Sequence, residues 1–332
     1  MTSLEDCFNS TNEEVLDLSN WDVSNVTTLK NCFYCAENLE SLDVSNWNVS
    51  KVKDMSYCFC DCEKLCRLDL SHWNVSNVTN LIECFSGCLS LKYLDLTLWD
   101  TSKVETLNTC FYECISLSYL GIESWNTSNV KDLSNCFASC TSLSSLGLSL
   151  WNVSNVKDLS FCFASCSSLS SLELSLWNVS NVKDLHGCFS GCMSLNSLDL
   201  KYWNVSNVEN LSHCFSNCTE LRNLDLRHWD TSSVRDMNNC FSGCTSLAYL
   251  NIENWVIDEM CDIEDMFKGC DNLSVIKCRR NVFERIMNEE WSYENGYARR
   301  MDVMNIPDDD DDEMIECFTI NFDIDANYIE LY

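Results

Sequence analysis

Residues 151–176 of the chain read WNVSNVKDLSFCFASCSSLSSLELSL, and the next residue, Trp177, begins the same pattern again. Successive tryptophans of this pattern are separated by 26 residues, with no insertion or deletion. A period of about 20–50 residues is typical of solenoids, in which each unit packs on its neighbours. Ten tryptophans keep this phase: Trp21, Trp47, Trp73, Trp99, Trp125, Trp151, Trp177, Trp203, Trp229 and Trp255.

Apolar residues recur at fixed distances from each tryptophan, which we count as position zero. Phe stands at +12 and Leu at +18 in every unit, and Val, Leu, Ile or Met fill +5, +8 and +21. The alternation in residues 39–44 (LESLDV) predicts a short strand, and the spacing of +5, +8 and +12 predicts a short helix capped by Ser at +3. We therefore expect an α/β solenoid, a right-handed superhelix with one short parallel strand and one short helix in each 26-residue coil.

The repeat divides the chain into three parts. Residues 1–20 form a partial repeat that should cap the first coil, with Cys7 and Phe8 one residue out of phase, and residues 21–278 hold the ten repeats. Residues 279–332 form an acidic C-terminal cap and tail, which suits the outer end of a solenoid. In this last part, residues 279–304 predict an amphipathic helix, residues 308–313 are an acidic run, and residues 318–324 alternate as a strand does.

The charge balance excludes some classes of partner. With 21 Lys and Arg against 51 Asp and Glu, the net charge is −30. A basic surface for nucleic acid is thereby excluded, and anionic membrane surfaces are disfavoured. The chain lacks an apolar stretch of about 18 residues that could insert into a membrane, and residues 1–15 lack the apolar run of a signal peptide. These features predict a cytoplasmic location.

Signs of catalysis are missing from the sequence. It contains none of the common nucleophile, phosphate-binding, dinucleotide-binding or zinc-protease motifs, and the four histidines fall at different phases of the repeat. Residues 323–327 begin like a calcium-binding loop but lack the glycine and the distal glutamate. We expect a non-enzymatic protein without a cofactor or a metal ion.

Most of the 25 cysteines follow the repeat, because eight units carry Cys at both +11 and +15. Three interpretations are open. Free cysteines would act as small apolar residues that fill a buried ladder, disulfides would need an oxidising compartment, and metal ligation would need four ligands that converge between coils. The candidate structural pairs are Cys58 and Cys62, Cys84 and Cys88, Cys110 and Cys114, Cys136 and Cys140, Cys162 and Cys166, Cys188 and Cys192, Cys214 and Cys218, and Cys240 and Cys244.

Position +22 carries a column of mostly acidic residues next to inward-facing leucines, so these side chains should point outward from the strand. The column is either a solvated face or an electrostatic surface for a basic protein partner. Positions +19 and +20 add Arg and Tyr in the outer repeats, and exposed Tyr favours binding. The candidate partner surface therefore comprises Asp17, Asp43, Asp69, Asp95, Glu173, Asp199, Asp225, Arg67, Tyr93, Tyr119, Arg222 and Tyr249.

The pattern x-L-D-L-S-x-W-[DN]-[VT]-S-N-V-x-[DN]-[LM]-x-x-C-F-x-x-C-x-S-L covers roughly residues 14–278. It closely resembles the mycoplasma-type 26-residue repeat of BspA-like leucine-rich-repeat surface proteins, although nine repeats have Cys where that family usually has Met before the Phe. The resemblance implies a leucine-rich-repeat-like fold and protein interaction or adhesion at a cell surface. The alternatives are an intracellular scaffold or inhibitor-like binder with reduced thiols, and a structural spacer. The oligomeric state is left open.

Overall fold

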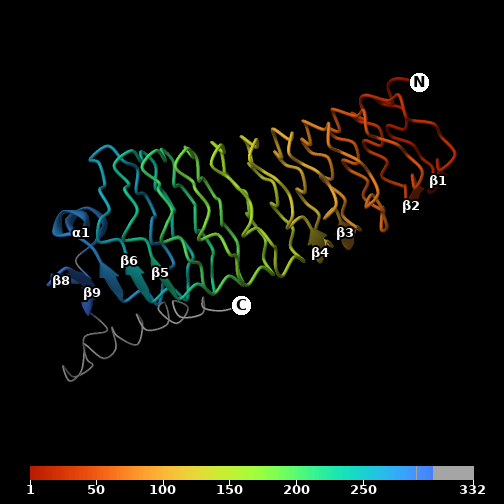
Figure 1. Ribbon diagram of the computed structural model, residues 1–332. Coiled ribbons are helices and arrows are strands. Elements are labelled where there is room, and N and C mark those ends of the chain that lie inside the picture. The colour runs from red at the N-terminus through yellow and green to blue at the C-terminus, as the bar shows by residue number, and fades with distance from the viewer. Residues whose placement is uncertain (289, 302–332) are drawn as a thin grey trace, which may run out of the picture.

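The computed structural model describes residues 1–288 and 290–301. The repeats wind into an elongated, curved solenoid with the N-terminus at one end (Figure 1). We number the coils 1 to 10 from the tryptophan that begins each, Trp21 to Trp255. The acidic run at 308–313, the predicted strand at 318–324 and the loop at 323–327 lie outside the described residues.

Short parallel strands line one side of the solenoid at positions +20 to +22. Each pairs with the strand one coil away in a register of 26 residues, and its middle residue is turned inward. Coil 2 and coils 5 to 7 carry no regular strand at these positions. The strands are β1 (Val15–Asp17), β2 (Ser41–Asp43), β3 (Tyr93–Asp95), β4 (Tyr119–Gly121), β5 (Asn223–Asp225), β6 (Tyr249–Asn251) and β7 (Val275–Lys277).

The predicted helix in each coil is wrong. Positions +8 to +15 form consecutive tight turns, and the residues at +10 and +14 adopt the left-handed conformation, for example Asn135 (φ 55°) and Ser139 (φ 62°) in coil 5. An α-helix of L-residues does not tolerate a left-handed residue in every turn. The expected α/β class is therefore corrected to a solenoid of strands, bridges and turns.

Backbone hydrogen bonds explain why turns replace the helix. In coil 4, the amides of Thr109 and Phe111 donate to carbonyl oxygens of coil 5, at 2.9 Å each. The amide of Cys110 between them donates back to Leu107 at 3.1 Å. Every second amide thus joins two coils, and the amides between them close the turns. This pattern satisfies the buried backbone without a helix.

Side chains of Asp and Asn cap the corners of each coil. At positions +1, +7 and +22, their oxygen atoms accept the amide two residues later, as Asn48 Oδ1 does from Ser50 at 3.2 Å. Ser at +3 is therefore the residue whose amide is capped, and its predicted role as a helix N-cap is wrong. Such turns are a common use of Asp and Asn.

Two aromatic columns run through the core. From Phe8 to Phe267 the phenylalanine rings stack with centroids 5.3–5.8 Å apart. Trp47 and the following tryptophans of the repeat are buried, and the Trp125 indole N–H donates to the carbonyl of Leu96 in the strand turn one coil earlier, at 3.0 Å. The column includes Phe8, so the N-terminal partial repeat continues the stack despite its shift of one residue.

The C-terminal cap differs from the predicted helix over residues 279–304. Helix α1 covers only Arg280–Ile286, and a hairpin of β8 (Trp291–Glu294) and β9 (Tyr297–Arg300) follows it. Asn295 and Gly296, both with positive φ, form its turn, as Asn-Gly pairs commonly do. Strand β9 runs antiparallel to β7 and extends its sheet. Among the described residues, no helix has the length and apolar character needed to cross a membrane.

Candidate functional site

The structure brings together five of the predicted partner-surface residues on the sheet face of coils 2 to 4. Tyr93 and Tyr119 belong to the paired strands β3 and β4, and their rings stack with centroids 4.6 Å apart and an angle of 11° between the planes. The two side chains are 57% and 41% exposed. Arg67 and Tyr93 line a shallow hollow of about 500 Å³ together with Asp69 and Asp95. We call Arg67, Asp69, Tyr93, Asp95 and Tyr119 the tyrosine cluster.

Gly121 leaves room for side chains of the tyrosine cluster to lie against its backbone. A Cβ atom at this residue would lie 2.8 Å from Asp95 Oδ1 and 3.1 Å from the Tyr119 hydroxyl oxygen. Glycine interrupts the acidic column at +22. The space that a side chain would need there is occupied by the Asp95 carboxylate and the Tyr119 hydroxyl group. Gly121 is therefore a positioning residue of the cluster.

The carboxylates of the cluster are held in place by the turn that follows each strand. Asp69 Oδ1 accepts the hydroxyl and the amide of Ser71, at 2.7 and 3.0 Å, and Thr97 does the same for Asp95. Hydrogen bonds from these hydroxyl groups, and then from the amides, lower the pKa of Asp69 and Asp95 from the usual value of an aspartate. Both groups are therefore ionised at neutral pH.

The two halves of the acidic column differ in their partners. Asp199 pairs with Lys201 at 3.4 Å and Asp225 with Arg227 at 2.9 Å. In the part of the chain that the structure describes, Asp17, Asp43, Asp69 and Asp95 have no salt bridge to Lys or Arg, and Glu173 has none either. The ion pairs of the column therefore lie at its C-terminal end.

In the second predicted group, Arg222 is exposed and Tyr249 is less accessible than the two tyrosines of the cluster. Tyr249 is half-buried next to the C-terminal cap, and this burial raises its pKa to about 12. Its backbone amide and that of Ala248 both donate to the carbonyl of Arg222. Neighbouring Lys277 is engaged by Glu253 at 2.9 Å. The structure therefore favours the tyrosine cluster of coils 2 to 4 as the candidate site.

Each cysteine that the structure describes is a free thiol, and those at +11 and +15 of coils 2 to 9 are buried. Burial raises the pKa of the Cys136 and Cys140 thiols well above the usual value of a cysteine. Cys7 and Cys66 are exposed. Within residues 1–288 and 290–301, no group of three or more His, Cys, Asp or Glu residues is arranged to hold a metal ion.

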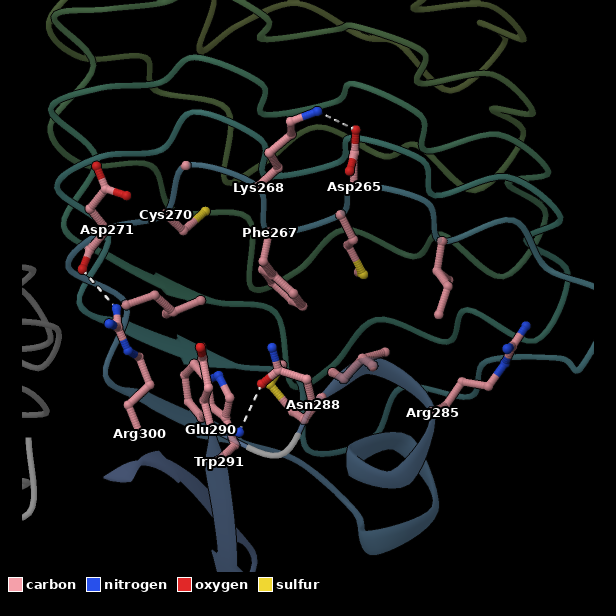
Figure 2. A pocket seen from close by; sticks show the side chains of 16 residues that line it. Asp265, Phe267, Lys268, Cys270, Asp271, Arg285, Asn288, Glu290, Trp291 and Arg300 are labelled. Atoms are coloured by element: carbon pink, nitrogen blue, oxygen red, sulfur yellow. Dashed lines mark hydrogen bonds and ion pairs between the residues drawn. The ribbon is translucent and has the colours of Figure 1, made fainter. Parts of the chain in front are cut away.

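A cavity of about 540 Å³ lies between coil 10 and the C-terminal cap (Figure 2). Phe267 and Cys270 of the coil face Trp291 and Asn288 of the cap across it. Lys268 is bound to Asp265 at 2.7 Å and does not reach into it. Because residues 289 and 302–332, which adjoin the cap in the sequence, are outside the described residues, we assign no site to this cavity.

Sequence reasoning missed an exposed apolar column at position +25, the residue before each tryptophan. Leu98 and Leu150 are 78% exposed, Leu176 is 76% exposed and Tyr202 is 68% exposed. The signal was present in the sequence as Ser-Leu-Trp at residues 149–151 and 175–177.

Comparisons with solved structures found several leucine-rich-repeat proteins. A leucine-rich cell surface protein of Faecalibacterium prausnitzii is 18% identical over 82% of this chain and 80% of its own, with a TM-score of 0.38. A leucine-rich-repeat protein of Bacteroides ovatus is 17% identical over 85% and 83%, with a TM-score of 0.36. Similarities at this level say nothing about what this chain binds. A search of curated proteins found no match.

The match to a protein family is extensive. The profile of the family described as "Mycoplasma protein of unknown function, DUF285" matches residues 2–114, 79–197 and 159–279. Together these three segments span the N-terminal partial repeat and nearly all ten coils, so they confirm the mycoplasma-type repeat seen in the sequence. The chain belongs to the DUF285 family of Mycoplasma proteins.

Proposed function

We propose that the chain is a non-enzymatic binding protein, and that the tyrosine cluster holds a basic segment of a protein partner. The observation that carries the proposal is the stacked, exposed pair of Tyr93 and Tyr119 beside two carboxylates without cationic partners. Tyr in such a position supplies a large contact area with little loss of conformational freedom on binding. A surface used only as a solvated face has no need of two aromatic rings at this place.

The chemistry of the cluster suits Lys or Arg side chains. A cation placed over the face of a tyrosine ring is attracted by the ring, and the attraction grows when a carboxylate lies beside it. Asp69 and Asp95 are kept ionised by their turns. Arg67 is the cation of the hollow, and it would fix the register of the partner by repelling a basic residue placed over it. Binding of this kind weakens as salt is added.

The cellular setting follows from the two alternatives that the sequence left open. Adhesion at a cell surface is the setting that the family resemblance implies. A scaffold or inhibitor-like binder with reduced thiols is favoured by the buried free cysteines. Both settings use the same surface, and only the purely structural spacer needs no binding surface.

The test uses a fluorescent peptide that alternates Lys and Arg with Ser and Gly, titrated with the full chain at low and moderate salt. The test variant is Tyr93→Ser/Tyr119→Ser, because Ser145 and Ser171 occupy the same position in coils 5 and 6. We expect about a tenfold or greater loss of affinity, which corresponds to about 1.4 kcal/mol. Tyr249→Ser, in the second group, should bind as the wild type does.

This design separates the cluster from the charge of the whole protein. The serine variants keep the net charge of −30, so unspecific attraction of a basic peptide would be the same in both. If the double variant binds the peptide as tightly as the wild type, the tyrosine cluster is not the binding site. If the wild type binds no peptide, the proposal of a basic partner is wrong.

A further inference from the structure

The strand side of the solenoid has a gap in its hydrogen-bond ladder between coils 2 and 3, at the tyrosine cluster. Between coils 3 and 4 the ladder is closed, since the amide of Ser118 donates to the carbonyl of Lys92 at 2.9 Å. Among the described residues, the equivalent bond from Lys92 to Cys66 is not formed, and neither is the next one along, from Leu70 to Asp95. Strands β2 and β3 accordingly belong to separate two-stranded sheets.

This gap leaves two backbone acceptors at the hollow of the tyrosine cluster. Cys66 and Asp95 both line the hollow, and their carbonyl oxygens accept no hydrogen bond from the described part of the chain. Such groups are bound by water until a ligand replaces it. In the described coils 4 to 8, ladder bonds are likewise missing or as long as 3.4 Å, but in coils 5 to 7 serine stands where coils 3 and 4 have tyrosine.

The carboxylates beside the gap have acceptor capacity to spare. Oδ1 of Asp69 and Oδ1 of Asp95 each accept the amide and the hydroxyl of their own turn, while Asp69 Oδ2 accepts no hydrogen bond from the described residues. Both residues stand at +22 of adjacent coils, about 4.8 Å apart along the axis. The two aspartates against Arg67 give the lining of the hollow a net charge of −1, which one further cation would neutralise.

The stack of two tyrosine rings ends at the hollow. One face of the Tyr93 ring lies on Tyr119 of coil 4, with an angle of 11° between the planes. The opposite face is therefore turned toward coil 2, on the side where the hollow lies. Within the described residues, no Lys or Arg lies over this ring. A planar cation can extend the stack by one member.

We propose that the hollow holds the guanidinium group of one arginine of the partner, as the anchor of the basic segment. This inference rests on the proposed function and deepens it by naming the anchoring residue. A guanidinium has five N–H donors in one plane for the two carboxylates and the carbonyl oxygens of Cys66 and Asp95, and its face stacks on Tyr93. The ammonium group of lysine has three donors and no planar face, so it leaves one of these four groups without a hydrogen bond. The hollow therefore prefers arginine to lysine at one position of the segment.

The test compares three fluorescent peptides that share one sequence of Lys, Ser and Gly. In the second peptide one central Lys is replaced by Arg, and in the third the same residue is citrulline, which keeps the planar shape of arginine and lacks its charge. We expect the full chain to bind the arginine peptide about tenfold more tightly than the lysine peptide of equal charge. The citrulline peptide should bind more weakly than the arginine peptide. Equal affinity for the arginine and lysine peptides, or for the arginine and citrulline peptides, overturns the anchor.

Two variants of the chain locate this preference. Asp69→Asn keeps an oxygen for the turn and removes one charged acceptor, so the ratio of arginine to lysine affinity should fall to about threefold or less. Asp43→Asn makes the same change at the same strand position of coil 1, outside the lining of the hollow. It should weaken both peptides equally and leave the ratio unchanged. A ratio that Asp69→Asn does not lower shows that the preference arises elsewhere and overturns the anchor.

The outcomes separate the anchor from the proposed function. If Tyr93→Ser/Tyr119→Ser weakens the binding of all three peptides but the wild type binds arginine and lysine equally, the basic segment binds at the tyrosine cluster and the arginine anchor is wrong. If none of the peptides binds to the wild type, the proposed function fails together with the anchor.

Discussion

The Sγ atom of Cys140 lies 3.0 Å from the carbonyl oxygen of Phe111, one coil earlier in the solenoid. The same thiol-to-carbonyl contact joins nine consecutive pairs of coils, from Cys62 with Phe33 to Cys270 with Phe241, at 3.0–3.2 Å. The position needs a side chain that is small, apolar enough to be buried and still able to donate a weak hydrogen bond. Cysteine alone combines these three properties.

Replacement of this thiol should lower stability by a modest amount. Cys140→Ala removes one buried atom and one weak hydrogen bond, and Ala36 shows that alanine is accepted at +15 in coil 1. We expect a loss of about 1–2 kcal/mol in the free energy of unfolding, measured by urea denaturation. Cys66→Ala, at an exposed cysteine, is the control and should change stability by less than about 0.5 kcal/mol. Equal stability of Cys140→Ala and the wild type would show that the ladder has no energetic role.

Thiol labelling should distinguish exposed from buried cysteines. In the native protein we expect Cys7 and Cys66 to react rapidly with an alkylating agent, because they are exposed. The ladder thiols should react only after unfolding, since they are buried and burial raises the pKa of groups such as Cys110 and Cys136.

The same labelling, performed directly in the native source and read by mass spectrometry, tests the redox state. Close to 25 free thiols would place the protein in a reducing compartment. Disulfides between +11 and +15 would contradict the free ladder, because Cys140 would then have no S–H to donate to Phe111. They would also favour the cell-surface setting over the intracellular one.

The strict period of 26 residues is why the solenoid and its core could be predicted from the sequence. A residue type repeated at +12 or at 0 must meet its own copy in the next coil, so stacked Phe and Trp columns follow from phase alone. The helix could not be separated from turns on the same grounds, because apolar spacings of three and four arise in both. The distinguishing signal was glycine at +14, as in Gly87 and Gly191, together with Gly187 at +10. These glycines mark left-handed residues inside the segment.

The C-terminal cap and the tyrosine cluster contain features that the 26-residue period could not predict. Asn295-Gly296 between two short aromatic-containing segments is a hairpin signal that outweighed the helical pattern of residues 279–304. At the site, phase alone placed Tyr93 beside Tyr119. The part of Gly121 could not be predicted, because it depends on where a neighbouring hydroxyl and carboxylate lie. The recurrence of leucine at +25 was visible in the sequence, but the exposure of its side chain was not, because exposure depends on which way the corner of the coil turns.

The left-handed positions provide a direct test of the turn structure. Gly191 has φ of 72°, and an added Cβ would lie 3.3 Å from Ser165 Oγ. We expect Gly191→Ala to lower the free energy of unfolding by about 1–2 kcal/mol. Ser139→Gly, at the equivalent residue of coil 5 with φ of 62°, should be neutral or stabilising by up to about 1 kcal/mol. A helix through this segment would give the opposite order, because glycine destabilises a helix and alanine favours it.

A fall in pH should destabilise the folded wild type more than a variant in which the turn-capping carboxylates are replaced by neutral side chains. The pKa values of Asp69 and Asp95 are lowered in the folded protein by hydrogen bonds from Ser71 and Thr97. The stabilisation from a lowered pKa is present above the unfolded value of about 3.9 and is lost as the pH falls through the folded value. In Asp69→Asn/Asp95→Asn the caps do not titrate, and Asn251 shows that asparagine can accept this amide, at 3.2 Å.

The measurement is the melting temperature of both proteins between about pH 6 and pH 2.5. The wild type should lose melting temperature relative to the variant as the pH falls below about 4. If the difference in melting temperature between the two proteins is constant over this pH range, these carboxylates have the same pKa in the folded and unfolded chains. It would also remove the argument that their turns hold them ionised for a partner.

Gly121 and Gly147 form a matched pair that tests how the tyrosine cluster is positioned. Both stand at +22 with ordinary backbone angles, but a Cβ at Gly121 would lie 2.8 Å from Asp95 Oδ1, whereas one at Gly147 would meet only Glu123, at 3.1 Å from its Cβ. Gly121→Ala should therefore displace the Tyr119 hydroxyl and the Asp95 carboxylate and weaken binding of the basic peptide about three- to tenfold. Gly147→Ala should leave peptide binding unchanged. Because both variants add the same methyl group to the same strand position, equal affinity in the two would show that the cluster does not depend on the gap at Gly121, and would leave the tyrosine rings alone to account for binding.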